Sequence, residues 1–257
     1  MIWKSALLAC MLMLAGKQNM GPSQTAAFGS STPPAVPSFV GYTYVSDTNA
    51  TSYSSITTPA INIGPNELLV AFCRSSTTDS SSDLPTVAPT ENATGASFTV
   101  IGVDATSGWN VGQMSYLYLG AGAPVASSTF TCTPYSASAY QAMTVLEFSV
   151  PSVTLNTSST TIDNSSVTTI TSGAFTTTSA PAMSVLCASG SGGDIFTAGD
   201  IAGGSSTLVG SDQPSITDAG VIGCEWNTSA ATVSSATGAM TSSQATNYVA
   251  ILGAFSY

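Results

Sequence analysis

AMSVLCAS, residues 182–189, is an apolar segment that runs into the Gly- and Ser-rich stretch GSGGD at residues 190–194. Successive side chains of a strand point to opposite faces, so the odd-numbered residues, including Cys187, would share one face. The even-numbered residues would share the other face, and both sets are largely apolar. The spacing therefore predicts a buried core strand that ends in a flexible loop.

Short alternations of this kind recur along the chain after residue 38, whereas a 3.6-residue apolar stripe with helix caps does not. Thr, Val, Ser and Gly are abundant and are poor in helix interiors. A set of many strands usually stacks as two sheets, because a single sheet leaves one apolar face wet. We therefore predict an all-β, two-sheet antiparallel sandwich with strands at 38–46, 67–75, 97–104, 113–119, 128–134, 141–150, 182–189, 220–226 and 247–257.

The two halves of the chain resemble each other around this segment. Residues 57–79 and 176–194 both contain a Thr run, a Pro, an apolar strand with Cys, and a Ser-rich exit with Asp. The similarity indicates two similar hairpins within one sandwich. It falls short of a tandem repeat, which would need a sustained period over more copies.

The N-terminal part of the chain has a different character. Residues 1–27 contain one early Lys and an apolar run that is too short to span a bilayer and has the length of a secretory core, with a candidate cleavage site at residues 25–27. The alternative is an uncleaved apolar arm that packs against a partner. A Pro- and Ser-rich linker over 28–38 would lead into a single large β-sandwich domain over 39–257.

The charge of the chain restricts its partners. Its 257 residues include 3 Lys and Arg, 13 Asp and Glu and 0 His, for a net charge of −10. With Lys4 and Lys17 in the N-terminal segment, Arg74 is the one remaining cation, so we expect neither nucleic acid nor anionic membrane as a partner. The lack of His removes Ser-His and Cys-His catalysis and the usual metal ligand.

Several segments resemble a loose group of bacterial and phage extracellular β-sandwich domains of jelly-roll or concanavalin-like type. The similarity spans about residues 39–257 and is sharpest at Glu147-Phe148-Ser149, although Val150 stands where Gly is usual in that group. It implies a secreted or surface-displayed protein, in some cases part of a virion, and it implies no catalytic residues. The matching segments are PNELLVA (65–71), SFTVIG (97–102), SYLYLGAGAP (115–124), TFTCTP (129–134), VLEFSVPS (145–152), SGAFTTTSAPAMSVLCASG (172–190) and YVAILGAF (248–255).

The cysteines after the N-terminal segment form an even set, which permits two disulfides in an exported chain. We predict that Cys73 pairs with Cys132 and Cys187 with Cys224, each within its own half of the chain. The alternative is buried free thiols that act as small apolar side chains. The chain has neither a CxxC pair nor a His partner for them, so zinc is not expected.

Carboxylates are the candidates for acid-base chemistry or for calcium. Glu147 and Glu225 lie in predicted strands and could serve a glycoside hydrolase as a pair, with Trp226 as a sugar platform. Asp194 and Asp200 in a Gly-rich segment could bind calcium, although a solvated loop is the simpler interpretation. We expect no other cofactor.

Aromatic side chains are the candidates for ligand contact. Trp109 and Tyr135 fall in loops, where ligand-binding residues concentrate, and Trp226 adjoins a strand carboxylate. Aromatic residues at period two, such as Tyr116 and Tyr118, are better explained as core or cross-strand pairs.

These observations lead to a non-catalytic extracellular or surface-displayed sandwich for binding or adhesion, with neutral glycans or other protein subunits as partners. The first alternative is a homo-oligomeric virion or filament subunit with an assembling N-terminal arm. The second is a glycoside hydrolase.

Overall fold

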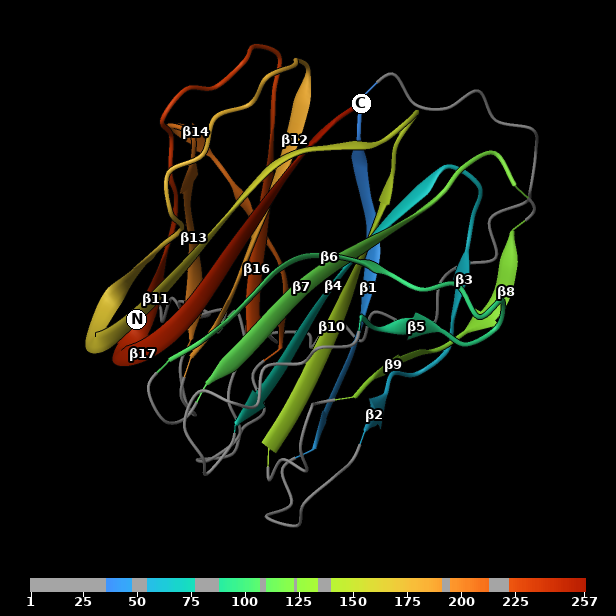
Figure 1. Cartoon of the computed structure of the whole chain (residues 1–257), viewed down its shortest axis with the longest axis horizontal. Helices are drawn as coiled ribbons and strands as arrows, with labels where there is room; N and C mark the ends of the chain where they lie inside the picture. Colours follow the sequence, from blue (N-terminus) through green and yellow to red (C-terminus); the bar gives the residue numbers. More distant parts are fainter. Residues whose placement is uncertain are drawn as a thin grey trace, which may run out of the picture.

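Two antiparallel sheets lie face to face, and shorter strands cover their outer faces (Figure 1). The computed structural model describes residues 36–47, 55–76, 88–106, 110–122, 124–133, 140–190, 195–212 and 222–257. Within these ranges every regular secondary-structure element is a β-strand, so the predicted all-β class is confirmed. The predicted leader or arm at 1–27 and most of the 28–38 linker lie outside the described residues. No helix in the described part is long and apolar enough to cross a membrane.

The first sheet is built from the N-terminal half of the described chain and has five antiparallel strands in the order β1-β10-β4-β7-β6. β4 has apolar side chains on both faces and is buried along its length, as expected for the central strand. The five strands of this sheet are β1 (Ser38–Asp47), β4 (Glu67–Ser76), β6 (Thr99–Ala105), β7 (Val111–Leu119) and β10 (Tyr140–Ser149).

The second sheet is built from the C-terminal half and runs β11-β17-β12-β16-β15, with β13 and β14 beside the first part of β17. The segment AMSVLCAS forms β12, and all of its residues are buried. The strands are β11 (Thr154–Thr171), β12 (Ala182–Ser189), β13 (Phe196–Ile201), β14 (Gly204–Ser205), β15 (Thr207–Asp212), β16 (Ile222–Ser229) and β17 (Gly238–Ser256).

Three apolar clusters hold these layers together. The central core lies between the two sheets, where Phe148 of β10 packs edge to face on Trp226 of β16, with ring centroids 5.3 Å apart. Its other buried members include Leu68, Val70, Phe72, Met114 and Leu146 from the first sheet and Met183, Val185, Cys187, Ile251 and Phe255 from the second.

Each sheet also has an outer core on its far face. The first outer core contains Leu69, Ala71 and Val145 and is closed by a three-stranded and a two-stranded sheet. The second outer core contains Leu186 and Leu252 and is closed by β13 and the strands around it. The covering strands of the first sheet are β2 (Ile56–Thr57), β3 (Ile61–Ile63), β5 (Thr90–Glu91), β8 (Val125–Ser128) and β9 (Phe130–Cys132).

The two sheets repeat the same architecture. In each half, the last long strand lies between the first and the second, and the remaining two strands follow in reversed order. Phe39 pairs with Phe148 in the first sheet and Leu155 pairs with Phe255 in the second, and in both the register shifts directly afterwards. The similarity of residues 57–79 and 176–194 therefore has a structural basis, since β4 and β12 occupy equivalent places.

The repeat extends to the covering strands. β3 pairs with β8 ahead of the first sheet's central strands, and an isolated bridge between Phe175 and Ala236 stands at the equivalent place in the second half. The two halves share the central core, and the single domain over 39–257 stays a prediction.

The equivalence of Phe148 and Phe255 gives a prediction about stability. Both side chains are fully buried in the central core, so Phe148→Ala and Phe255→Ala should each lower the free energy of unfolding by about 3–5 kcal/mol. Val40→Ala, at a side chain that is 50% exposed, should change it by less than about 0.5 kcal/mol. Urea unfolding followed by tryptophan fluorescence measures all three; a large loss in one Phe variant alone would contradict the equivalence.

Candidate functional site

The predicted carboxyl pair Glu147 and Glu225 does not form a site. Glu147 lies on the outer face of the first sheet, in register with Leu69 of β4, and Glu225 lies on the outer face of the second, in register with Leu186 of β12. Both sheets and the central core separate them, and packed sheets are about 10 Å apart. The two carboxyls point away from each other, so they cannot flank one glycosidic bond as a hydrolase pair requires.

Glu225 has a structural role instead. Its Oε2 accepts hydrogen bonds from the Gly199 amide at 2.8 Å and the Ser206 hydroxyl at 2.6 Å. Two residues along β16, Asn227 donates to the carbonyls of Ile201 and Gly204 at 3.2 and 3.1 Å. Burial raises the pKa of Glu225, and the two hydrogen bonds partly oppose that rise. This face of β16 therefore holds the β13–β14 hairpin against the second sheet.

Glu147 has a different partner, which sequence reasoning missed. Glu67, at the start of β4, lies on the same outer face of the first sheet, and the two carboxyl groups are hydrogen-bonded to each other. Only 8% of Glu67 and 5% of Glu147 are exposed. Burial first, and then the hydrogen bond and negative charge of Glu67, raise the pKa of Glu147 to about 9. At neutral pH Glu147 therefore keeps its proton.

Two glycines lie directly beside this carboxyl pair. The Gly64 amide donates to Glu67 Oε2 at 2.7 Å, and a Cβ on Gly64 would lie 2.7 Å from Glu67 Oε1. A Cβ on Gly41 of β1 would lie 3.8 Å from Glu147 Oε2. Glu147 Oε1 has no hydrogen-bond partner among the described residues. The arrangement can take up and release a proton in a largely buried place, and it leaves little room for a larger group beside Gly64.

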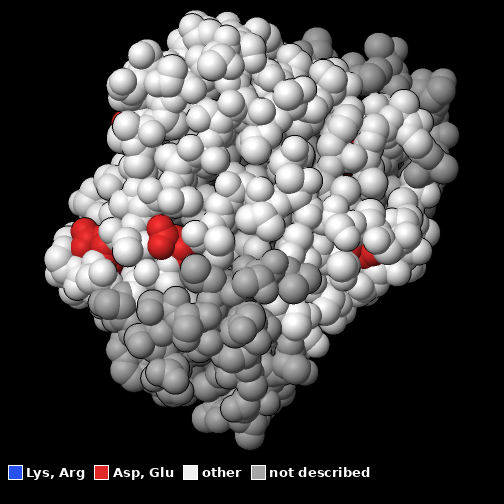
Figure 2. All heavy atoms as spheres, in the orientation of Figure 1, with Lys and Arg blue, Asp and Glu red and all other residues white. Residues whose placement is uncertain are grey.

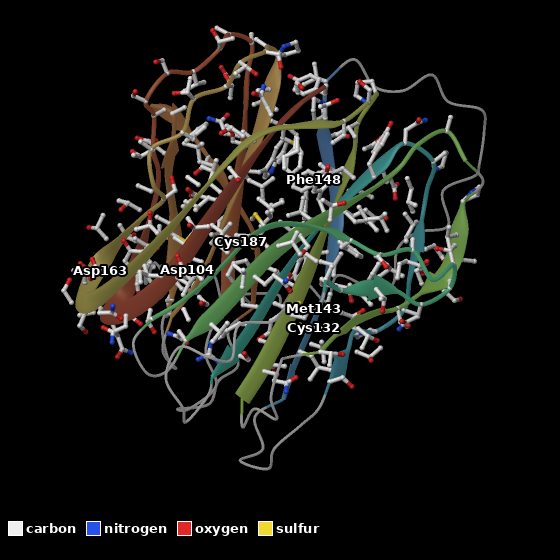
Figure 3. The ribbon with its side chains drawn as sticks, in the orientation of Figure 1. Asp104, Cys132, Met143, Phe148, Asp163 and Cys187 are labelled. Carbon is white, nitrogen blue, oxygen red and sulfur yellow. A yellow bond between two sulfur atoms is a disulfide. The ribbon has the colours of Figure 1, made fainter. Side chains whose placement is uncertain are left out.

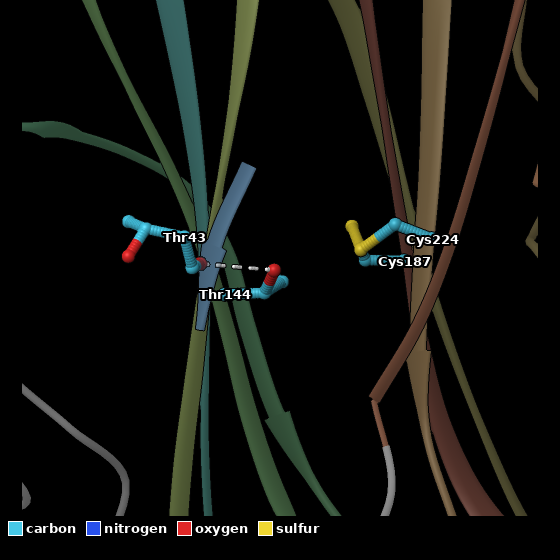
Figure 4. The surroundings of a disulfide bond; sticks show 4 residues. All are labelled: Thr43, Thr144, Cys187 and Cys224. Carbon is cyan, nitrogen blue, oxygen red and sulfur yellow. Dashed lines mark hydrogen bonds between the residues drawn. A yellow bond between two sulfur atoms is a disulfide. The ribbon is translucent and has the colours of Figure 1, made fainter. Parts of the chain in front are cut away.

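The cysteines divide into one disulfide and one thiol pair. Cys187 and Cys224 face each other on β12 and β16 with Cα atoms 4.1 Å apart and form a disulfide, as predicted. This disulfide belongs to the central core and faces Thr144 of the first sheet, whereas the side chain of Thr43 points away from it (Figure 4). Cys73 and Cys132, which were predicted to form the second disulfide, are instead neighbouring free thiols that are buried, so the alternative that the sequence left open applies to this pair.

The predicted aromatic ligand residues do not gather in the described structure. Trp226 is partly buried, its ring packs on Phe148 and its Nε1 is shielded from solvent, so the described structure uses it in the central core, and its role as a sugar platform stays a prediction. Trp109 and Tyr135 lie outside the described residues. The Tyr116 ring packs on Phe255, as expected for core aromatics.

The predicted calcium site is represented by Asp200 alone, because Asp194 lies outside the described residues. Asp200 is exposed at the end of β13, and its charge contributes to the raised pKa of Glu225. The described part of the chain contains no group of three or more His, Cys, Asp or Glu that could hold a metal ion.

The molecular surface has few charged groups. Arg74, the one described basic residue, is 5% exposed and donates two hydrogen bonds to Asn110 Oδ1, at 3.1 and 2.7 Å. Asn110, directly before β7, in turn donates to the carbonyl of Asn247 at 3.0 Å, which links β4 to β17 of the other sheet. In the view of Figure 2, acidic side chains form small isolated patches and basic side chains do not appear on the described surface.

The described acidic side chains fall into a buried set and a surface set. All four described Glu residues are buried, including Glu91, whose carboxylate accepts hydrogen bonds from Ala93 and Thr94. The described acidic side chains that reach the surface are Asp104 and Asp163, both labelled in Figure 3, and Asp200. The charges of the described chain therefore serve mainly to connect its layers, and the surface that remains is rich in Ser and Thr.

Comparisons of the chain with protein-family models, curated proteins and solved structures find no match.

The carboxyl pair predicts how stability depends on pH. Since the folded-state pKa of Glu147 is about 9 and its ordinary value is 4.5, the folded state keeps a proton that the unfolded chain loses above about pH 4.5. This contribution to stability is complete below pH 4.5 and is lost as pH rises through about 9, with a slope of up to about 1.4 kcal/mol per pH unit. Urea unfolding between pH 5 and 9 should show stability falling in the parent and a flatter profile in Glu147→Gln.

Glu91→Gln is the control for that experiment. Burial raises the pKa of Glu91, but hydrogen bonds from Thr94 and Ala93 outweigh burial and leave the pKa below its ordinary value. Its contribution is present above the unfolded pKa and lost as pH falls, so this variant should keep the parent's slope above pH 5. Parallel profiles for the parent and Glu147→Gln would show that the carboxyl pair does not hold the proton.

Proposed function

We propose that this protein is a non-catalytic, extracellular or surface-displayed β-sandwich that binds or adheres to uncharged partners, with neutral glycans as the leading class. The observation that carries the proposal is the use of charged groups inside the fold. Arg74, Glu67, Glu91, Glu147 and Glu225 are all buried, and the described surface keeps three acidic side chains, Asp104, Asp163 and Asp200. A surface of this kind gives little electrostatic attraction to ions or polyanions, so contacts must come from hydroxyl, amide and apolar groups.

The location outside the cell belongs to the same proposal. A buried disulfide between Cys187 and Cys224 is compatible with an oxidising compartment. The secretory interpretation of residues 1–27 adds to it, as does the resemblance to extracellular sandwich domains. Intact mass of the exported protein would test it, since a start near residue 28 is expected after export and an intact Met1 would count against a cleaved leader.

A jelly-roll classification is also proposed. In each half, the last long strand returns to lie beside the first, which is the connection of a Greek key. Jelly rolls are built from such connections in two facing sheets. Each sheet with its covering strands is one such candidate unit.

A second candidate function is that of a subunit in a virion or filament, and β11 favours it. This strand of 18 residues pairs only with β17 in the described structure, and its one ionisable side chain is Asp163. Edge strands of monomeric proteins commonly carry Lys or other charges that prevent pairing with another chain. An edge dominated by Ser and Thr lacks that protection.

Glycan arrays at two salt concentrations test the leading function. We expect binding to neutral glycans that changes less than about twofold between 50 and 500 mM NaCl, because few ionic contacts are available. The absence of binding to every neutral glycan, or binding to sulfated glycans that salt abolishes, would contradict the proposal.

Two lysine variants separate assembly from ligand binding. Ile162 on β11 is 38% exposed and Ile195 beside β13 is 48% exposed, so each can be replaced without opening a core. If subunits pair through β11, Ile162→Lys should shift the sedimentation profile from assembled to monomeric protein, whereas Ile195→Lys should leave it unchanged. Equal behaviour of the two variants would remove β11 from the interface.

A further inference from the structure

The thiols of Cys73 and Cys132 meet between two layers of the fold. Cys73 lies on β4 of the first sheet, beside Met143 of β10, and Cys132 lies on β9 of the three-stranded covering sheet. Both belong to the first outer core, and Figure 3 labels Cys132 next to Met143. Cys73 is 1% exposed and Cys132 is 5% exposed, and their side chains are hydrogen-bonded.

This contact is unlike the general packing of buried cysteine. A free thiol in an apolar core needs only a small apolar cavity, and the two residues come from separate sheets that have no ladder in common. Here the two thiols are nevertheless neighbours within one buried cluster. A disulfide requires two sulfur atoms that can reach bonding distance with little backbone movement, and two neighbouring thiols in one cluster are the arrangement from which such a bond can form.

We propose that Cys73 and Cys132 form a redox-active dithiol, and that its oxidation by a small disulfide such as oxidised glutathione joins β4 to β9. In the reaction one thiolate attacks the glutathione disulfide, forming a mixed disulfide and releasing one glutathione thiol. The second thiolate attacks the mixed disulfide, the protein S–S bond forms and the second glutathione leaves. The protein loses two protons and two electrons, and the oxidant becomes two thiols.

The oxidised form would hold the covering layer onto the first sheet. The covering strands are short, and their contact with the sheet depends on the first outer core. A covalent link from β9 to β4 limits the opening of that layer and constrains the unfolded chain. The existing Cys187–Cys224 disulfide joins neighbouring strands within the second sheet, so it does not perform this function. The inference is independent of the proposed function, because it rests on the burial of the two thiols in one cluster between two layers.

Burial controls when this reaction happens. Burial first, and then the hydrogen bond and charge of Cys132, raise the pKa of Cys73 well above its ordinary value. Thiolate is the reacting species, so the closed outer core should react slowly with a small disulfide. Opening of the covering layer, or exposure during folding, should make the reaction fast.

The test uses the full chain with Cys10→Ser, so that Cys73 and Cys132 are the remaining thiols outside the disulfide. The protein is prepared with the two thiols reduced, then incubated with oxidised glutathione at increasing urea concentrations below the unfolding transition. We expect the thiols titrated after denaturation to fall from two to none and the intact mass to fall by about 2 Da as two hydrogens are lost. Non-reducing peptide mapping should show Cys73 linked to Cys132, and the melting temperature should rise by roughly 5–10 °C.

Cys73→Ser and Cys132→Ser are the matched controls, and each should show neither the cross-linked peptide nor the rise in melting temperature. A purified protein that already contains the cross-link would support the proposal directly. Thiols that stay free at every urea concentration, stable glutathione adducts on both cysteines, or exchange into the Cys187–Cys224 disulfide would each overturn it.

Discussion

The packing of two equivalent sheets against each other is the contact on which the rest of the structure depends. β4 and β10 contribute one wall of the central core, and β12 and β17 contribute the other. Each of these strands is also apolar on its far face, because a second cluster lies there. A fully buried large apolar side chain contributes about 1.5–3 kcal/mol, so a shared central core with an outer core on each side stabilises the layered strands of the described residues.

The positions of the buried charged groups follow from this layering. A buried charge is costly unless it is hydrogen-bonded, and several of the buried ionisable groups in the described residues lie where layers are connected. Glu225 and Asn227 hold a hairpin to the second sheet, Arg74 reaches the other sheet through Asn110, and Glu147 lies against Glu67 on the outer face of the first sheet. The described part of the chain therefore has few charged groups on its surface. That surface is the physical basis of the proposed contact with uncharged partners.

The sequence predicts the apolar strands well and the partnerships between them poorly. Period-two spacing located β4, β10 and β12, because their side chains face apolar clusters on both sides. It missed β11, TLNTSSTTIDNSSVTTIT, because a strand at a sheet edge with Ser and Thr on both faces shows no apolar alternation. β11 is held as a strand by its long antiparallel ladder of backbone hydrogen bonds with β17.

The sequence predicts a side-chain pair correctly only where few residues are available as partners. Cys187 and Cys224 were assigned to each other because they lie in the same half. Glu147 was assigned to Glu225 because both looked like strand carboxylates, but which sheet a strand joins decides which face its side chains occupy. The sequence does contain a signal for the pairing of Glu67 with Glu147. Glu67 is the first residue of the central strand β4, and Glu147 lies near the last residue of β10. Only the antiparallel register of β4 and β10 brings those two ends together.

Amide hydrogen exchange, resolved by residue, tests most directly whether both halves close around one central core. The account predicts that β4 and β10 of the first sheet and β12 and the second part of β17 exchange at similar and very slow rates, through one global opening. Slow exchange confined to one half, with the other exchanging as fast as the edge strands, would contradict it.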